Sequence, residues 1–259
     1  MTSTRRHRKH SGRDPAEASR ATESVINWVD RLRQDESVDV GHNHADASAL
    51  ASKSVMRIDH LIFAVPELDA GVAEIEARFG VRAEGGGQHV GQGTHNKLLA
   101  LGPTTYLEII APDPAQPEPP GPRPYGVDGV VRRGLVGWAV ACEDIDLTVD
   151  QTRAAGFDPG DVINGHRRTA DGTTLTWRIT STAQAAGVVP FLISWGDTPH
   201  PAASAAPGLR LESLCIEHPQ PDSITCALRI LGTTVPVTRA HRAALVAHLI
   251  GPTGGGKLR

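Results

Sequence analysis

The chain repeats one pattern of hydrophobic segments, and this repeat constrains the fold more than any single motif does. Residues 56–112 have the pattern of a strand, a helix and further strands, and residues 134–200 follow the same order. Phe63 aligns with Trp138 when the two copies are superimposed in sequence. A unit of about 60 to 75 residues that recurs in this way is one supersecondary module, which buries its apolar face against its neighbour. We therefore predict two strand-helix-strand-strand-strand (βαβββ) modules.

A weaker third copy follows over residues 209–251, in which Asp222 matches Asp69 of the first copy by spacing. We predict a partial βαββ module there. Between the first two modules, residues 113–133 are rich in proline and read as an extended linker. Residues 252–259 are predicted to be a flexible tail.

Residues 1–55 differ in composition from the rest of the chain, because polar and charged residues dominate them. Such a composition is typical of disorder, and the segment lacks the apolar core of a secretory signal. Residues 21–34 have the apolar spacing that predicts a short amphipathic helix. Translation that begins at Met56 would be an alternative explanation of this extension.

Charge and cysteine content exclude several classes of partner. The 259 residues carry a formal net charge of −3, whereas surfaces that bind nucleic acids or anionic membranes are basic. No apolar run approaches the ~20 residues that cross a bilayer. Three scattered cysteines are too few for a disulfide scaffold, which favours a reducing cytoplasm. We expect a cytoplasmic protein whose partner is a small molecule, with no nucleic acid and no membrane.

The repeat also predicts where a ligand would bind. Each module has one sheet with a helix on one face, and its other, concave face must be covered. Two paired modules bring their sheets together around a cleft, which is the favoured place for a ligand. We predict an α+β fold in which paired βαβββ modules form a curved mixed sheet around a cleft, with the partial third module beside it.

Three stretches carry a resemblance to a known superfamily, namely residues 91–102, 105–113 and 190–201. With the repeat, they resemble the vicinal oxygen chelate superfamily (glyoxalase, bleomycin resistance, dioxygenase), and more closely the glyoxalase-like domain proteins of bacteria. The resemblance covers residues 56–251. It implies the paired βαβββ fold but not one reaction, because the superfamily includes lyases, epimerases, ring-cleaving dioxygenases and metal-free antibiotic-binding proteins.

The resemblance implies a metal site at His60 and Glu108. In the metal enzymes of the superfamily, the first strand of a module supplies a histidine and the fourth a glutamate, and these residues occupy those positions. The metal polarises a carbonyl or enolate oxygen. In the second module, Leu135 stands where the histidine would be, and the last strand offers no glutamate. His95 or His89 would then be the third ligand of a Zn, Fe, Mn, Ni or Co ion.

Other arrangements of these residues stay open. His166 of the second module is a further candidate for the third ligand. Without a metal, His60 would be hydrogen-bonded to Glu108 and would stabilise the sheet or act as a general base. A carboxylate beside a histidine on a concave face favours contact with a ligand.

The glycine-rich segment 84–96 is predicted to be a ligand-binding loop at the mouth of the cleft, because its glycines permit close approach of the backbone. Its polar side chains are the candidates for substrate contact: His89, Thr94, His95 and Asn96. In the second module, Arg178 is predicted to anchor an anionic substrate, and Trp195 is a further substrate-binding residue. Alternatively, residues 84–96 are an ordinary surface loop, and Arg178 is exposed to solvent on the outer face of its strand.

These expectations lead to three hypotheses of function. The first is a glyoxalase-like enzyme, leaning to a metal-dependent lyase or isomerase, that acts on a small oxygen-rich organic substrate with His60 and Glu108 as catalytic residues. The second is a metal-free protein that binds and sequesters a small molecule, which the missing ligands of the second module favour. The third is a partner-binding role in which the third module joins a homodimer.

Overall fold

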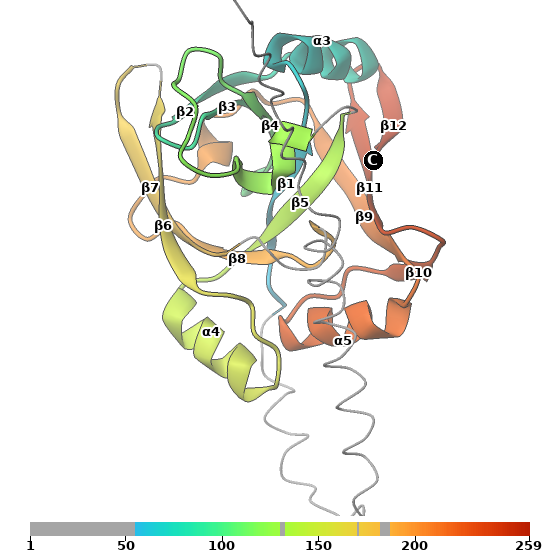
Figure 1. Ribbon diagram of the computed structural model, residues 1–259. Coiled ribbons are helices and arrows are strands. Elements are labelled where there is room, and N and C mark those ends of the chain that lie inside the picture. Colours follow the sequence, from blue (N-terminus) through green and yellow to red (C-terminus); the bar gives the residue numbers. More distant parts are fainter. Residues whose placement is uncertain (1–54, 130–132, 170, 182–186) are drawn as a thin grey trace, which may run out of the picture.

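The computed structural model describes residues 55–129, 133–169, 171–181 and 187–259. The predicted helix over residues 21–34 lies outside the described residues. Within the described part, eight strands close into a barrel and four strands form a second sheet beside it (Figure 1). None of the helices in these ranges is long and apolar enough to cross a membrane.

The first module consists of β1 (Ile58–Ala64), α3 (Leu68–Phe79), β2 (Glu84–His89), β3 (Thr94–Gly102) and β4 (Thr105–Pro112). The helix α3 begins where the Glu67 carboxylate accepts hydrogen bonds from amides of the first turn. It ends at Gly80, whose φ of 76° is the left-handed geometry that glycine adopts without strain. The local sequence therefore sets both ends of this helix.

The second module consists of β5 (Gly134–Ala141), α4 (Ile145–Ala154), β6 (Val162–Thr169), β7 (Thr174–Thr180) and β8 (Phe191–Ser194). The side chain of Asp144 caps α4 by accepting a hydrogen bond from the Leu147 amide. Two short 3₁₀ turns, η1 (Pro124–Gly129) and η3 (Pro201–Ala203), lie before and after this module.

Strand pairing joins the first two modules along two seams. The order around the barrel is β1-β4-β3-β2-β6-β7-β8-β5. β1 is parallel to β4 of its own module and antiparallel to β5 of the second, and β2 is antiparallel to β6. The predicted α+β fold of paired βαβββ modules is confirmed, and the curved mixed sheet closes into a barrel.

The third module is more complete than the sequence predicted. It consists of β9 (Arg210–His218), α5 (Pro221–Ile230), β10 (Val237–Arg239), β11 (Ala244–Gly251) and β12 (Gly254–Leu258), in the sheet order β10-β9-β11-β12. The flexible tail predicted for residues 252–259 was wrong, because β12 pairs antiparallel with β11 and buries Leu258. A fourth strand therefore turns the predicted βαββ unit into a βαβββ unit.

The predicted loop over residues 84–96 is also corrected, since most of it is strand. β2 pairs with β3 and with β6, so the segment forms one of the seams between the modules. A Cβ atom on Gly87 would lie 1.9 Å from the carbonyl oxygen of Arg168. Glycine is therefore needed here for close approach of the strands rather than for a loop.

The proline-rich linker is held against the barrel. Arg123 Nε donates a hydrogen bond to the carbonyl oxygen of Gly93, and its NH1 donates to Asp128 at 2.6 Å. These contacts fix the linker beside the turn that joins β2 and β3.

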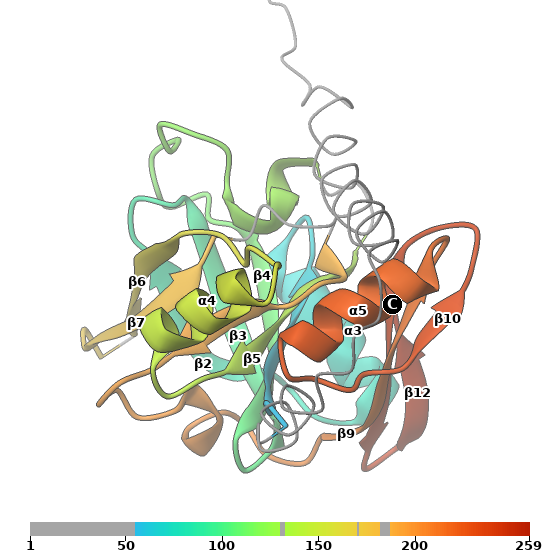
Figure 2. The same ribbon diagram turned by 90° about the horizontal axis from the view of Figure 1, so that it is seen from below.

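Side chains alternate along β1 between an outer and an inner core. Leu61 and Phe63 face the large outer core, which α3 and the third module help to form. Ile62 and Ala64 belong to a smaller cluster inside the barrel, on the same face as His60. α4 and α5 lie at one end of the molecule and α3 at the opposite end (Figure 1 and Figure 2). No helix of the described residues fills the barrel interior, which contains a cavity.

Candidate functional site

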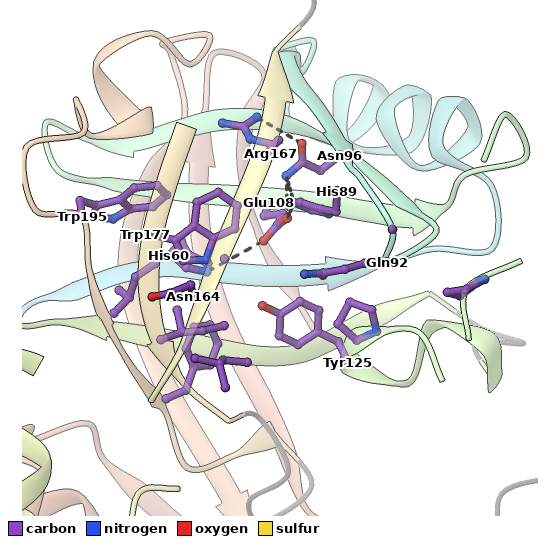
Figure 3. Close-up of a pocket in the computed structure, with 18 of the residues that line it drawn as sticks. His60, His89, Gln92, Asn96, Glu108, Tyr125, Asn164, Arg167, Trp177 and Trp195 are labelled. Atoms are coloured by element: carbon purple, nitrogen blue, oxygen red, sulfur yellow. Dashed lines mark hydrogen bonds and ion pairs between the residues drawn. The ribbon is translucent and has the colours of Figure 1, made fainter. Parts of the chain in front are cut away.

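The barrel strands surround a cavity of about 280 Å³. This volume is just below the range of about 300–1,000 Å³ for pockets that hold drug-sized ligands, so it suits a smaller molecule. Its buried polar lining is His60, His89, Asn96, Glu108 and Arg167. Its aromatic lining is Tyr106, Tyr125, Trp177, Phe191 and Trp195. Figure 3 shows the polar groups together, with Tyr125 facing them across the cavity.

His60 lies on β1 at the centre of the polar group, and its side chain is held from several directions. Its Nδ1 is 2.7 Å from Asp59 Oδ1, and its ring stacks on Tyr106 with 4.7 Å between the centroids. Its Nε2 faces Glu108 Oε2 of the neighbouring strand β4 at 3.9 Å. The prediction that these two strands are neighbours, with His60 and Glu108 converging, is confirmed by this geometry.

Asp59 anchors His60 from outside the cavity and is fully buried. Its carboxylate also accepts hydrogen bonds from Trp195 Nε1 at 3.1 Å and from His200 Nε2 at 3.0 Å. Burial alone would raise the pKa of Asp59, but hydrogen bonds from His200 and His60 outweigh it and lower the pKa to about 2. Asp59 is therefore ionised at neutral pH and acts only as an acceptor.

Asn96 connects the carboxylate of Glu108 to the second module. Its Nδ2 donates to Glu108 Oε1 at 2.6 Å, and its Oδ1 accepts from the Gly87 amide at 2.9 Å and from Arg167 at 3.3 Å. These bonds use both oxygen lone pairs of the amide, so Asn96 and Glu108 are fixed in orientation. Figure 3 shows this chain of contacts.

His89 lies beside Oε1 of Glu108, whereas His60 faces Oε2. Its Nδ1 is 2.9 Å from Thr94 Oγ1, and its Nε2 is 3.7 Å from Glu108 Oε1. Burial lowers the pKa of His89 to about 4, although the charge of Glu108 opposes that effect. His89 is thus neutral near pH 7 and adds no charge to the cavity.

Four of the predicted residues lie outside the cavity lining. Thr94 is buried and contacts His89 Nδ1 rather than the cavity. Strand alternation explains the positions of the other three. His95 on β3 points away from the cavity that its neighbour Asn96 lines, and it lies 3.8 Å from Asp113. Arg178 on β7 is exposed and forms an ion pair with Asp146. His166 on β6 is exposed as well.

Arg167 and Tyr125 line the cavity but were not predicted as site residues. Arg167 stands one position after His166 on β6, so alternation puts it on the opposite face of that strand. The pairing of β6 with β2 places this face in the cavity. Tyr125 has a φ of 57°, which is uncommon for a bulky residue. No sequence signal indicated that the linker would place this phenol in the cavity wall.

The donor atoms of the cavity do not fit the predicted metal site. In the described part of the chain, no three or more His, Cys, Asp or Glu side chains are arranged to hold a metal ion. The Asn96 side-chain nitrogen lies 3.4 Å from His89 Nε2 and donates a hydrogen bond to Glu108 Oε1. Neither His89 Nε2 nor Glu108 Oε1 is therefore free to bind a metal. This leaves His60 Nε2 and Glu108 Oε2, two donors where a resident divalent metal has three or more protein ligands.

The fold and the cavity define a protein of the vicinal oxygen chelate type. A family model described as a glyoxalase-like domain matches residues 58–232, which is more than half of the chain. The chain therefore belongs to the glyoxalase-like domain family, as the resemblance implied. No curated protein matches the sequence.

Solved structures are similar to this chain at low sequence identity. A hypothetical protein from Staphylococcus aureus is 15% identical, with a TM-score of 0.54 over 78% of this chain and 85% of that chain. A methylmalonyl-CoA epimerase from Streptomyces coelicolor, in complex with 2-nitronate-propionyl-CoA, is 21% identical, with a TM-score of 0.40 over 54% of this chain and 98% of that chain. The epimerase from Mycobacterium tuberculosis is 20% identical, with a TM-score of 0.39 over 59% and 95%. At 15% identity, the likeness to the Staphylococcus aureus protein concerns the fold alone.

Proposed function

We propose that this protein is an enzyme that binds a small oxygen-rich organic molecule in the barrel cavity and isomerises or cleaves it by proton transfer. The observation that carries the proposal is the buried pair of His60 and Glu108, with 3.9 Å between Nε2 and Oε2, in the wall of the cavity. An imidazole and a carboxylate that face one ligand space are suited to general acid–base catalysis.

Asp59 determines which nitrogen of His60 acts as the base. Because the pKa of Asp59 is about 2, its carboxylate cannot donate at neutral pH. His60 Nδ1 must therefore carry the proton of their hydrogen bond. In the neutral ring, the lone pair is then on Nε2, which faces the cavity.

In the proposed isomerisation, His60 Nε2 takes the proton from a hydroxyl-bearing carbon beside a carbonyl group, which gives an enediolate. Glu108 moves the hydroxyl proton to the former carbonyl oxygen, and His60 returns its proton to the adjacent carbon. In the cleavage variant, a neighbouring group leaves and takes that proton. Burial raises the pKa of the Tyr125 phenol, so it stays a hydrogen-bond donor for the developing oxyanion.

Exchange of carbon-bound hydrogen with solvent deuterium tests this proposal. Small α-hydroxy ketones and aldehydes, such as dihydroxyacetone and glyceraldehyde, are incubated with the protein in heavy water and followed by proton NMR. We expect exchange with the wild type and a loss of about 100-fold or more in His60→Asn and Glu108→Gln. His166→Asn, on an exposed position of β6, is the matched control. Exchange that is equally fast in His60→Asn would refute the proposed role.

A second function, metal-free sequestration of a small molecule, is favoured by the lining of the second module. This module presents the aromatic side chains Trp177, Phe191 and Trp195 rather than acids or metal ligands. Aromatic side chains bind apolar ligands by packing, without catalysing a reaction. Quenching of tryptophan fluorescence by a hydrophobic probe, together with no exchange for any compound, would support sequestration and overturn the enzymatic proposal.

A further inference from the structure

Arg167 is a buried cation in the cavity wall that the proposed proton transfer does not use. Arg167 is 4% exposed to solvent, and it lines the same cavity as His60 and Glu108 (Figure 3). Its NH1 donates one hydrogen bond, to Asn96 Oδ1 at 3.3 Å. A guanidinium has five N–H donors. This contact therefore uses only a small part of its hydrogen-bonding capacity.

Among the described residues, no carboxylate lies within 4 Å of the Arg167 guanidinium as an ion-pair partner. Glu108 is within 4 Å of His60 and His89 instead, and it acts on Arg167 only at longer range. Burial lowers the pKa of Arg167, which measures the cost of removing its charge from water. Glu108, the carboxylate of the same cavity, is oriented instead by the 2.6 Å hydrogen bond from Asn96. A buried charge is ordinarily paired. Glu108 acts on Arg167 only through its charge and not through a contact, so donors of the guanidinium remain for an anionic ligand.

Asn96 also holds Arg167 in place. Its Oδ1 is itself fixed by the Gly87 amide at 2.9 Å, so the guanidinium rests on a rigid acceptor. Arg167 is therefore positioned before a ligand enters, and an anionic group that binds it pays little for ordering the side chain.

We propose that Arg167 binds a carboxylate of the ligand, so that the cavity takes a small carboxylic acid with a hydroxyl or carbonyl oxygen on the neighbouring carbon. A guanidinium matches a carboxylate with two parallel hydrogen bonds. The proposal rests on the proposed function for the placement of the reacting carbon beside His60, and it adds the class of substrate. Trp177 and Trp195 supply the apolar wall for the rest of the molecule.

Binding of matched acids and amides tests this inference. The probes are pyruvate, 3-hydroxypyruvate, lactate and mandelate, each with its neutral amide, and binding is followed by quenching of tryptophan fluorescence. We expect the wild type to bind acids more tightly than amides. Arg167→Gln should weaken acid binding by about 10- to 100-fold and leave amide binding unchanged. Arg168→Gln is the matched control, since Arg168 is the next residue on β6 and is exposed.

Arg167→Lys provides a second variant if the glutamine variant does not fold. It keeps the charge but loses the paired hydrogen bonds of the guanidinium, so it should bind acids more weakly than the wild type and Arg168→Gln do, and bind amides equally well. Equal binding of acids and amides by the wild type, failure of every acid to bind, or equal acid binding in Arg167→Gln and Arg168→Gln would overturn the inference.

The two proposals fail in different ways. Acids that bind through Arg167 without any hydrogen exchange would leave the carboxylate site standing and remove the proposed chemistry. Exchange in neutral hydroxy ketones, with no preference for acids, would leave the chemistry standing and remove the carboxylate site.

Discussion

Replacing Asp59 by asparagine removes the group that holds His60, and the structure gives the size of the effect. Asp59 is fully buried and accepts hydrogen bonds from His60, Trp195 and His200 at 2.7, 3.1 and 3.0 Å. Although burial acts in the opposite direction, these histidines lower its pKa from 3.8 to about 2. At about 1.4 kcal/mol for each pKa unit, the ionised carboxylate contributes about 2 kcal/mol to the free energy of unfolding.

The direction of this pKa change fixes the pH range of the effect. Because the pKa of Asp59 is lower in the folded state than in the unfolded state, the stabilisation is complete above about pH 4 and is lost as the pH falls through about 2. Asp59→Asn is therefore expected to lower the free energy of unfolding by about 2 kcal/mol at neutral pH and by progressively less below about pH 4.

Urea unfolding followed by tryptophan fluorescence, across this pH range, measures the prediction. Asp150→Asn is the control, because Asp150 is exposed on α4 and its replacement should change stability little at any pH. A stability of Asp59→Asn equal to the wild type at neutral pH would refute the reasoning. A deficit of the same size throughout the acid range would refute it as well.

Three further predictions follow from packing and from the donor set. Gly165→Ala places a Cβ atom 2.2 Å from Trp177 Nε1, so the indole should move and its fluorescence maximum should shift; an unchanged spectrum would contradict this. Trp138→Ala removes a fully buried side chain and its 2.9 Å hydrogen bond to the Val188 carbonyl, so urea unfolding should show a loss of about 3–5 kcal/mol, and a far smaller loss would argue against this packing. Elemental analysis of purified protein should give clearly less than one divalent metal ion per chain, since the cavity offers two donors; a stoichiometric metal would count against that interpretation.

The sequence predicted the centre of the site because its signals are local to each strand. The repeat placed His60 on the first strand and Glu108 on the fourth, and the pairing of β1 with β4 brings them together. Asn96 was found through its position in a polar segment, and Trp195, which directly follows β8, was predicted as a substrate-binding residue of the second module. Both line the cavity.

The rest of the site depends on contacts between modules, which no local pattern reveals. Arg167 reaches the cavity because β6 pairs with β2 across the barrel seam. The prediction of Arg178 as the anionic anchor was wrong, because alternation on β7 turns Trp177 inward and Arg178 outward to Asp146. Tyr125 comes from the linker, whose path is set by long-range hydrogen bonds such as that from Arg123.

The position of the proton on His60 is the most direct test of the central claim, that Asp59 leaves the His60 Nε2 lone pair facing the cavity. Long-range nitrogen–proton NMR correlations distinguish the two tautomers of the neutral ring, and comparison with His60→Asn assigns the signal. The structure predicts a proton on Nδ1 and none on Nε2, with this preference lost in Asp59→Asn. A neutral His60 with its proton on Nε2 in the wild type would contradict the account.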